Sequence, residues 1–248
     1  MIAMILAAGL GTRLRPLTLT RPKALVEVGG KPLLWHVIDK VARAGARRIV
    51  INVHHKASQI TDYLAANGNF GLDIRVSDET SSLLDTGGAV RHARELLGSE
   101  GDEPILLHNV DIVSNADLKH LYAEGMRSDA TLLVSKRETS RYLLFDEEGM
   151  RLRGWTNIKT GEVKSPYADI DPSRCVRRAF SGIHVMSPRL FPLMESWPEK
   201  FSIIDFYLAA CKALDIRGYE QEGLCIVDAG KAENLEQAGD LIIRYNNK

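Results

Sequence analysis

The stretch LAAGLGTRLRPLTLTRPK, from Leu6 to Lys23, decides the fold and points to the chemistry. It begins inside an apolar run, residues 2–8, that has the composition of a buried first strand. Gly9 and Gly11 allow the chain to turn sharply after this strand and to direct backbone amides at an anion. Four cations belong to the same segment: Arg13, Arg15, Arg21 and Lys23. A buried strand, a glycine turn and clustered cations together predict a site for a nucleoside triphosphate.

The spacing excludes two common phosphate-binding loops. A dinucleotide fingerprint needs a third glycine where Leu14 stands, and a Walker loop needs GK[ST] after four spacer residues. A nicotinamide-dependent oxidoreductase would also need a ribose-binding acid after its second strand, which here ends in Asn52. We therefore expect a triphosphate loop of another kind.

Composition predicts one compact globular protein with a sizeable core. The 248 residues are 45% hydrophobic, and Lys plus Arg and Asp plus Glu both total 32. This balance gives no basic field that would indicate nucleic acid as a partner. The three cysteines are scattered and are typical of reduced thiols in a cytoplasmic protein. Residues 1–10 are too short for a membrane span, so we expect no membrane partner; the oligomeric state stays open between a monomer and a simple dimer.

Hydrophobic periodicity in the first 139 residues predicts strands that alternate with helices. Strands are expected at residues 2–8, 48–53, 72–76, 104–109 and 131–135, and helices at residues 32–45, 57–66, 88–97 and 116–124. The alternation favours an α/β fold, a Rossmann-like three-layer sandwich with a mixed, mainly parallel sheet.

From about residue 140 the pattern changes to short strand-like pieces. These are residues 142–145, 152–155 and 180–186, followed by helices at 188–196, 203–214 and 231–245 and a strand at 224–227. We interpret the short strands as a small β-rich lid for a second substrate. The predicted organisation is a single domain, residues 1–248, with residues 1–139 mainly a nucleotide-binding core and residues 140–248 the lid and closing strand and helices.

Two aspartates stand at the ends of predicted buried strands. Asp111 lies in LHNVDI and Asp228 lies in CIVDAG. An unpaired carboxylate in such a place is costly, and two of them can share one Mg²⁺ whose remaining positions are filled by phosphate oxygens and water. The alternative is that either aspartate caps the helix that follows it.

The pattern GxGTRxxPxTxxxPK, matched without a gap from Gly9 to Lys23, resembles the signature of the sugar-1-phosphate nucleotidyltransferases. The resemblance implies attack of a sugar phosphate oxygen on the α-phosphorus of a triphosphate, which gives a nucleotide sugar and pyrophosphate with the help of Mg²⁺. The NVD segment resembles the family's G/N-x-D motif, which implies a metal role for Asp111. VDAGK departs from the family's WxDxGT, with Ile226 for the aromatic residue and Lys231 for the threonine, and Asp228 is the second expected metal ligand.

Within the family, the compact form, the INVHH segment and the TGG turn most resemble the uridylyltransferases of N-acetylmuramate 1-phosphate, which recycle cell-wall sugars. UTP with N-acetylmuramate 1-phosphate is therefore the expected substrate pair. GTP with mannose 1-phosphate or heptose 1-phosphate is the alternative. A non-catalytic regulator that binds a nucleotide sugar is the alternative from another class.

The resemblance also implies roles for individual residues. Arg13 and Lys23 are the expected catalytic residues, because both direct cations at substrate phosphates in similar enzymes. The expected nucleotide-binding residues are Leu6, Ala7, Ala8, Gly9, Gly11, Thr12, Arg13, Lys23, Asn52, Gly87, Gly88 and Asn109. Gly87 and Gly88 belong to an LDTGG turn for which a tight strand-to-helix connection is the alternative explanation.

The sugar side departs most from the family. The usual E-K-P segment is replaced by Thr156-Asn157-Ile158-Lys159, whereas FSGIH matches the next sugar-facing strand. The expected sugar-binding residues are Asn157, Gly182 and Asp205. The departure predicts an unusual acceptor.

Overall fold

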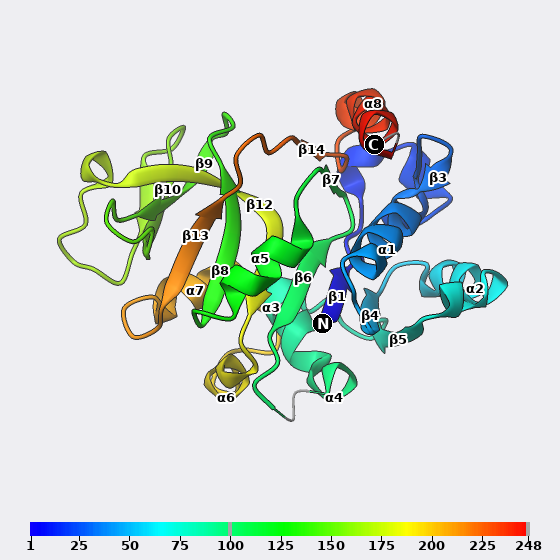
Figure 1. Cartoon of the computed structure of the whole chain (residues 1–248), viewed down its shortest axis with the longest axis horizontal. Coiled ribbons are helices and arrows are strands. Elements are labelled where there is room, and N and C mark those ends of the chain that lie inside the picture. The colour runs from blue at the N-terminus through cyan, green and yellow to red at the C-terminus, as the bar shows by residue number, and fades with distance from the viewer. Residues whose placement is uncertain (99–100, 247–248) are drawn as a thin grey trace.

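A mixed sheet forms the centre of the computed structural model, which describes residues 1–98 and 101–246 (Figure 1). Its main path is β11-β10-β9-β12-β6-β1-β4-β5, and β8 pairs with β12 and with β13. The strands of this sheet are β1 (Ile2–Leu6), β4 (Arg48–Val53), β5 (Asp73–Asp78), β6 (Ile105–Asn109), β8 (Ala130–Ser135), β9 (Arg141–Phe145), β10 (Leu152–Asn157), β11 (Glu162–Lys164), β12 (Val176–Met186) and β13 (Ile216–Glu220).

Helices and two short ribbons complete the fold. The helices are α1 (Leu33–Arg43), α2 (Ala57–Ala66), α3 (Asp85–His92), α4 (Arg94–Leu97), α5 (Leu118–Gly125), α6 (Phe191–Met194), α7 (Ile203–Ala210) and α8 (Leu235–Asn246). One ribbon pairs β2 (Glu27–Val28) with β3 (Lys31–Pro32), and the other pairs β7 (Ile112–Ser114) with β14 (Ile226–Asp228). No helix among the described residues is long and apolar enough to cross a membrane.

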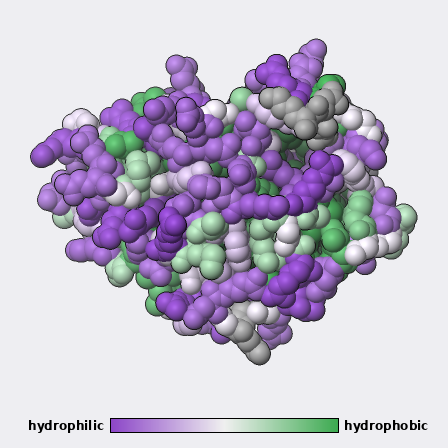
Figure 2. Space-filling view, in the orientation of Figure 1, coloured by the Kyte–Doolittle hydropathy of each residue, from purple (hydrophilic) through white to green (hydrophobic). Residues whose placement is uncertain are grey.

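Side chains that alternate along the strands build one core on each face of the sheet. On β1, Met4 packs into a cluster with residues of α3, α4, α6 and α7, whereas Ile5 packs into a cluster with residues of α1, α2 and α5. Polar side chains cover most of the face seen in Figure 2, because the large apolar residues gather in these cores. The predicted three-layer α/β sandwich is confirmed.

Parallel pairing is limited to part of the sheet. The strands β6-β1-β4-β5 are parallel, as are β8 and β13, whereas β12 pairs antiparallel with β6, β8 and β9. The N-terminal half of β12 thus joins the β-rich part and its C-terminal half joins the core. Because the two parts share one strand, we keep residues 1–248 as a single proposed domain.

Some predicted elements differ in the structure. The helix expected at residues 88–97 begins earlier, at Asp85, and is interrupted at Ala93 between α3 and α4. The helix expected at 203–214 ends at Ala210, and β13 follows it where we expected no strand. β13 escapes prediction because its sequence, IRGYE, has a single β-branched residue; its parallel pairing with β8 is what defines it.

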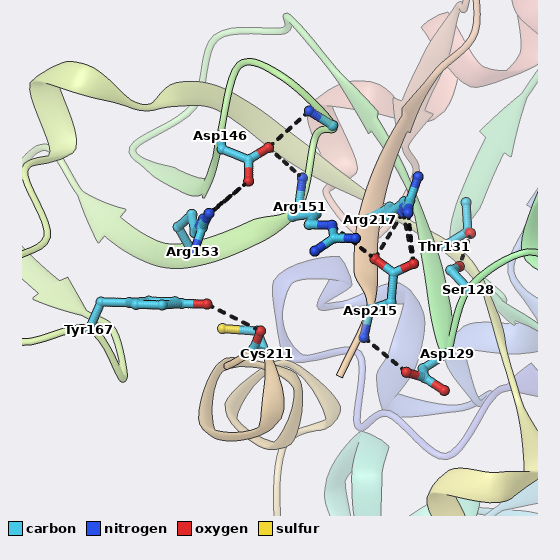
Figure 3. A network of polar contacts seen from close by, with 11 residues as sticks. Ser128, Asp129, Thr131, Asp146, Arg151, Arg153, Tyr167, Cys211, Asp215 and Arg217 are labelled. Atoms are coloured by element: carbon cyan, nitrogen blue, oxygen red, sulfur yellow. Dashed lines mark hydrogen bonds and ion pairs between the residues drawn. The ribbon is translucent and has the colours of Figure 1, made fainter. Parts of the chain in front are cut away.

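Polar contacts bind the β-rich part to the core (Figure 3). The Asp146 carboxylate accepts hydrogen bonds from the Gly149 and Arg151 amides and from Arg153 Nε, each at 3.1 Å. The Asp215 carboxylate pairs with Arg151 and Arg217, at 3.4 Å and 2.8 Å respectively. Arg151 thus connects the turn after β9 to the start of β13. This contact holds the β9–β10 hairpin of the β-rich part against β13.

Candidate active site

The loop after β1 has the shape that its glycines predict. Gly11 has a φ of +66°, and a Cβ atom there would lie 2.8 Å from Thr18 Cγ2. The Thr18 hydroxyl donates to the Gly11 carbonyl at 2.8 Å. A side chain at position 11 is therefore excluded both by backbone conformation and by space.

The loop borders a cleft of about 450 Å³ at the carboxyl ends of β1, β4 and β6. The cleft is lined by Leu6, Ala8, Gly9, Arg13, Lys23, Leu83, Asp85, Thr86, Asn52, Glu79, Asn109, Asp111 and Lys200. Parallel strands 1, 4 and 6 end at the same edge, so residues far apart in sequence meet there. The structure brings most of the expected nucleotide-binding residues together, and their roles remain proposals.

Two ion pairs lie at the charged end of the cleft; Arg13, Lys23 and Asp111 line it, whereas Asp228 does not. Lys23 Nζ lies 2.9 Å from Asp111 Oδ2, and Arg13 Nη1 lies 3.3 Å from Asp228 Oδ2. Asp111 precedes β7 and Asp228 ends β14, and these strands pair with Asp228 opposite Ile112. The ribbon therefore holds the two expected metal ligands at one end, each with its own cation.

Gly230 lies between the two carboxylates and was missed by sequence reasoning. A Cβ atom at Gly230 would lie 2.4 Å from Asp111 Oδ2, 2.8 Å from Asp228 Oδ1 and 3.0 Å from Arg13 Nη2. The Gly230 amide also donates to Asp228 Oδ1 at 2.9 Å. The motif VDAG offered the only signal, a glycine two residues after the aspartate.

The carboxylate pair fits a divalent cation. Distances of 2.4 Å and 2.8 Å from the position of a Gly230 Cβ put Asp111 Oδ2 and Asp228 Oδ1 at most about 5.2 Å apart. Two oxygens bound to one Mg²⁺ lie at most roughly 4.2 Å apart, so a shift of about 1 Å or less lets both carboxylates bind the same ion. Two protein oxygens leave room for phosphate oxygens and water, which Mg²⁺ retains readily. Among the described residues there is no group of three or more acidic, His or Cys side chains that could hold a metal, so substrate oxygens would have to complete such a site.

The opposite end of the cleft is built around a buried amide. Asn52 Oδ1 accepts from the Ala7 amide at 2.6 Å, and Asn52 Nδ2 donates to Glu79 Oε1 at 2.7 Å. Glu79 is 1% exposed, and burial raises the pKa of its carboxyl group. Ala7 thus supports Asn52 instead of lining the cleft.

Gly87 and Gly88, the expected nucleotide contacts, pack against another part of the chain, and their contact with a nucleotide stays a prediction. Both amides donate to the Phe201 carbonyl, at 2.8 Å and 3.2 Å. A Cβ atom would lie 2.3 Å from Phe201 Cε2 at position 87 and 2.3 Å from the Glu199 carbonyl oxygen at position 88. The double glycine therefore lets residues 199–201 pack against α3, and the preceding Asp85 and Thr86 line the cleft instead.

A second cavity, of about 540 Å³, lies beside the first. It is lined by Arg137, Thr139, Arg141, Leu143, Trp155, Asn157, Glu162, Lys164, Phe180, Ser202, Ile204, Asp205 and Leu208. Lys200 lines the first cavity and Ser202 the second, so the two adjoin across about 7 Å of chain. Asn157 and Asp205 are brought together here, as expected of sugar-binding residues.

Gly182 does not line this second cavity. Its φ is +72°, and a Cβ atom there would lie 2.8 Å from Asn109 Nδ2 and 3.0 Å from Ile112 Cγ1. Gly182 allows β12 to pack closely against the end of β6, which supports Asn109 at the cleft. The sugar contact expected of Gly182 stays a prediction. Gly11 and Thr12 likewise belong to the loop but do not line the cleft.

The sequence of this chain is similar to those of known proteins. A family model described as nucleotidyl transferase matches residues 2–142, more than half of the chain. N-acetylmuramate alpha-1-phosphate uridylyltransferase of Caulobacter vibrioides is 49% identical over 114 residues, which are 45% of this chain and 46% of that protein. Mannose-1-phosphate guanyltransferase of Yarrowia lipolytica is 31% identical over 229 residues, 88% of this chain and 59% of that protein.

A solved structure described as a putative glucose-1-phosphate thymidylyltransferase from Bacillus anthracis covers 97% of this chain and 94% of its own. The TM-score is 0.79 at 18% sequence identity, so this similarity concerns the fold alone. The alignments span about half the length of the curated relatives.

Proposed function

Since the chain belongs to the nucleotidyl transferase family, we propose that it transfers a nucleoside monophosphate from a nucleoside triphosphate to a sugar 1-phosphate, releasing pyrophosphate. The observation that carries the proposal is the placement of Lys23–Asp111 and Arg13–Asp228 at the edge of the sheet, where two cavities adjoin. One cavity suits a nucleotide and the other a sugar, with the charged groups available to the phosphates.

The chemistry needs charge neutralisation more than proton transfer. A sugar phosphate is ionised near neutral pH, so its oxygen attacks the α-phosphorus without a general base. Lys23 and Arg13 would exchange their carboxylate partners for substrate phosphates and stabilise the charge that develops there. Asp111 and Asp228 would hold Mg²⁺, which when bound neutralises phosphate oxygens and aligns them.

UTP and N-acetylmuramate 1-phosphate are the substrates that we propose. The support is the similarity to the uridylyltransferase of Caulobacter vibrioides, whose sequence identity of 49% is higher than that of the Yarrowia lipolytica relative. These substrates would belong to cytoplasmic recycling of cell-wall sugars.

GTP with mannose 1-phosphate is the second candidate, because the Yarrowia lipolytica relative aligns with 88% of this chain. Heptose 1-phosphate is a further guanylyl acceptor to test. A non-catalytic regulator would bind nucleotide sugar without turnover. The retention of Arg13, Lys23, Asp111 and Asp228 at one site favours catalysis.

Pyrophosphate release by the purified protein tests the proposal. The assay combines UTP, GTP, CTP or dTTP with N-acetylmuramate, mannose, glucose or heptose 1-phosphate, with and without Mg²⁺. We expect turnover with UTP and N-acetylmuramate 1-phosphate that requires Mg²⁺ and disappears in Asp111→Asn. Turnover only with GTP and mannose or heptose 1-phosphate would replace the substrate pair, and tight binding of nucleotide sugar with no turnover would support the regulator.

A further inference from the structure

The floor of the second cavity is one face of the antiparallel strands β9, β10 and β11. Strand register places Arg141 beside Asn157 and Asn157 beside Glu162, and it places Leu143 beside Trp155 and Trp155 beside Lys164. Residues paired in this way point to the same face of a sheet. All six line the cavity. The polar row is Arg141, Asn157 and Glu162, and the partly apolar row beside it is Leu143, Trp155 and Lys164.

The wall opposite this floor is formed by α7 and is partly apolar. Ile204 and Leu208 line it, and Asp205 forms an ion pair with Lys164 at 3.2 Å. Lys164 Nζ also lies 5.5 Å from the centre of the Trp155 ring. Aromatic and aliphatic surfaces suit the C–H faces of a sugar, and they suit methyl groups on its substituents.

The charge of the cavity is unbalanced. Its lining carries three cations and two carboxylates, of which Lys164 and Asp205 neutralise each other. Within the described residues, neither the Arg137 nor the Arg141 guanidinium forms an ion pair with a carboxylate. Arg137 Nη2 instead donates to the Phe180 carbonyl at 3.0 Å, which orients the guanidinium at the cavity wall. Two arginines are thus available to an anion.

The phosphate of the acceptor does not account for these arginines. It must reach the α-phosphorus of the nucleotide, and the Lys23–Asp111 pair that serves it lines the other cavity. A neutral sugar would therefore leave both guanidiniums without a charged partner. Glu162, the remaining carboxylate, lies two strands from Arg141 on the same row, roughly 10 Å away, so an anion is favoured at the Arg141 end.

Resting on the proposed function, we propose that Arg137 and Arg141 form a subsite for a carboxylate carried by the acceptor sugar. The acceptor class is a hexose 1-phosphate with an acidic ether substituent, of which the lactyl ether of N-acetylmuramate is an example. A guanidinium matches a carboxylate with two parallel hydrogen bonds, whereas a hexose without that substituent offers none. The two arginines would then make the enzyme discriminate between this acceptor and mannose, glucose and N-acetylglucosamine 1-phosphates.

The matched pair of acceptors is N-acetylmuramate 1-phosphate and N-acetylglucosamine 1-phosphate, which differ only by the lactyl group. We measure kcat/KM for both with UTP, and binding of both by calorimetry, in the wild type and in Arg137→Gln, Arg141→Gln and Arg177→Gln. Arg177 is exposed on β12 and does not line the cavity, so it is the control. Thermal unfolding verifies that each variant is folded.

We expect the wild type to prefer N-acetylmuramate 1-phosphate by about tenfold or more. Arg141→Gln and Arg137→Gln should each remove most of this preference, with little change for N-acetylglucosamine 1-phosphate or for the KM of UTP. Arg177→Gln should match the wild type. Loss that is equal for both acceptors, or equal wild-type use of both, would overturn the carboxylate subsite and leave nucleotidyl transfer standing.

Absence of turnover with every pair would count against the proposed function, and calorimetry then tests the subsite separately. Binding of N-acetylmuramate 1-phosphate that is tighter than that of N-acetylglucosamine 1-phosphate and weakened by Arg141→Gln would support it. Binding of neither acceptor, or equal binding of both, would overturn it.

Discussion

Lys23 Nζ lies 2.9 Å from Asp111 Oδ2, and both side chains are largely buried, with exposed fractions of 14% and 8%. Their Cα atoms belong to segments 88 residues apart, and the parallel strands β1 and β6 bring them together. Each residue supplies the counter-charge that the other needs when no polyanion is present. In the proposed reaction the same two groups would turn to a phosphate and to Mg²⁺.

Replacement of Lys23 should abolish most turnover. For Lys23→Ala we expect kcat/KM to fall by about 10²-fold or more, because a cation directed at the developing charge is lost. The protein should remain folded, with a free energy of unfolding lowered by about 1–3 kcal/mol since Asp111 loses its partner. Lys119→Ala, at an exposed position on α5, is the control. Near-normal activity of folded Lys23→Ala would remove Lys23 from the site.

Gly230→Ala should disable the carboxylate pair without disturbing the sheet. The added methyl group would lie 2.4 Å from Asp111 Oδ2 and 2.8 Å from Asp228 Oδ1, so at least one carboxylate must move. We expect a fall in kcat of about tenfold or more and a higher Mg²⁺ requirement, measured by metal titration of pyrophosphate release. Gly223→Ala provides a comparison, because no atom lies within 4 Å of its added methyl group, although its φ of +65° adds some backbone strain. An unchanged Mg²⁺ titration in Gly230→Ala would contradict this account.

Asn52→Ala should weaken the nucleotide end of the cleft. The substitution leaves the Ala7 amide and Glu79 Oε1 without the partners that they have at 2.6 Å and 2.7 Å. We expect a loss of about 1–3 kcal/mol in the free energy of unfolding and a raised KM for the triphosphate. Denaturant titration and initial rates at varied UTP check these effects. An unchanged KM for UTP in the folded variant would limit Asn52 to a structural role.

His184 should make the protein sensitive to acid. Burial lowers the pKa of His184 to about 3, against 6.5 for an ordinary histidine, and its ring packs between Phe180 and Tyr207 at centroid distances of 5.5 Å and 5.6 Å. Below pH 6.5 His184 is therefore protonated in the unfolded chain, whereas in the folded protein it stays neutral down to about pH 3. Stability contributed by the neutral ring is present above pH 6.5 and is lost as pH falls, by about 2 kcal/mol between pH 7 and pH 5.

His184→Leu should remove this part of the acid dependence. Denaturant titrations at pH 7 and pH 5 compare it with the wild type and with His55→Gln, in which an exposed histidine is replaced. On acidification from pH 7 to pH 5, His184→Leu should lose less free energy of unfolding than the wild type or His55→Gln. An equal loss in all three proteins would contradict the proposed neutral state of the buried ring.

The part of the site that could be predicted depends on strand ends. A polar residue at the end of a buried parallel strand lies at the carboxyl edge of the sheet, and Asn52 and Asp111 both lie at that edge beside the Gly9 loop. The alternation of strands and helices likewise predicted the three-layer fold. Both inferences use local sequence patterns that adopt nearly the same structure wherever they occur.

The part that could not be predicted depends on packing between distant segments. Gly87 and Gly88 accommodate residues 199–201, more than a hundred positions away, and nothing near the TGG turn signals this. Gly182 makes room for Asn109 for the same kind of reason. A glycine allows another group to approach the backbone closely, and the sequence does not reveal whether that group is a ligand or another segment of the chain.

The most direct test of nucleotidyl transfer is phosphorus NMR of UTP and N-acetylmuramate 1-phosphate incubated with the protein and Mg²⁺. We expect the three UTP resonances to be replaced by those of a diphosphate-linked nucleotide sugar and free pyrophosphate, and we expect Asp111→Asn to leave UTP intact. Release of inorganic phosphate with formation of UDP would show hydrolysis at the γ-phosphorus and would contradict nucleotidyl transfer. Unchanged UTP with every sugar phosphate of the panel would contradict it equally.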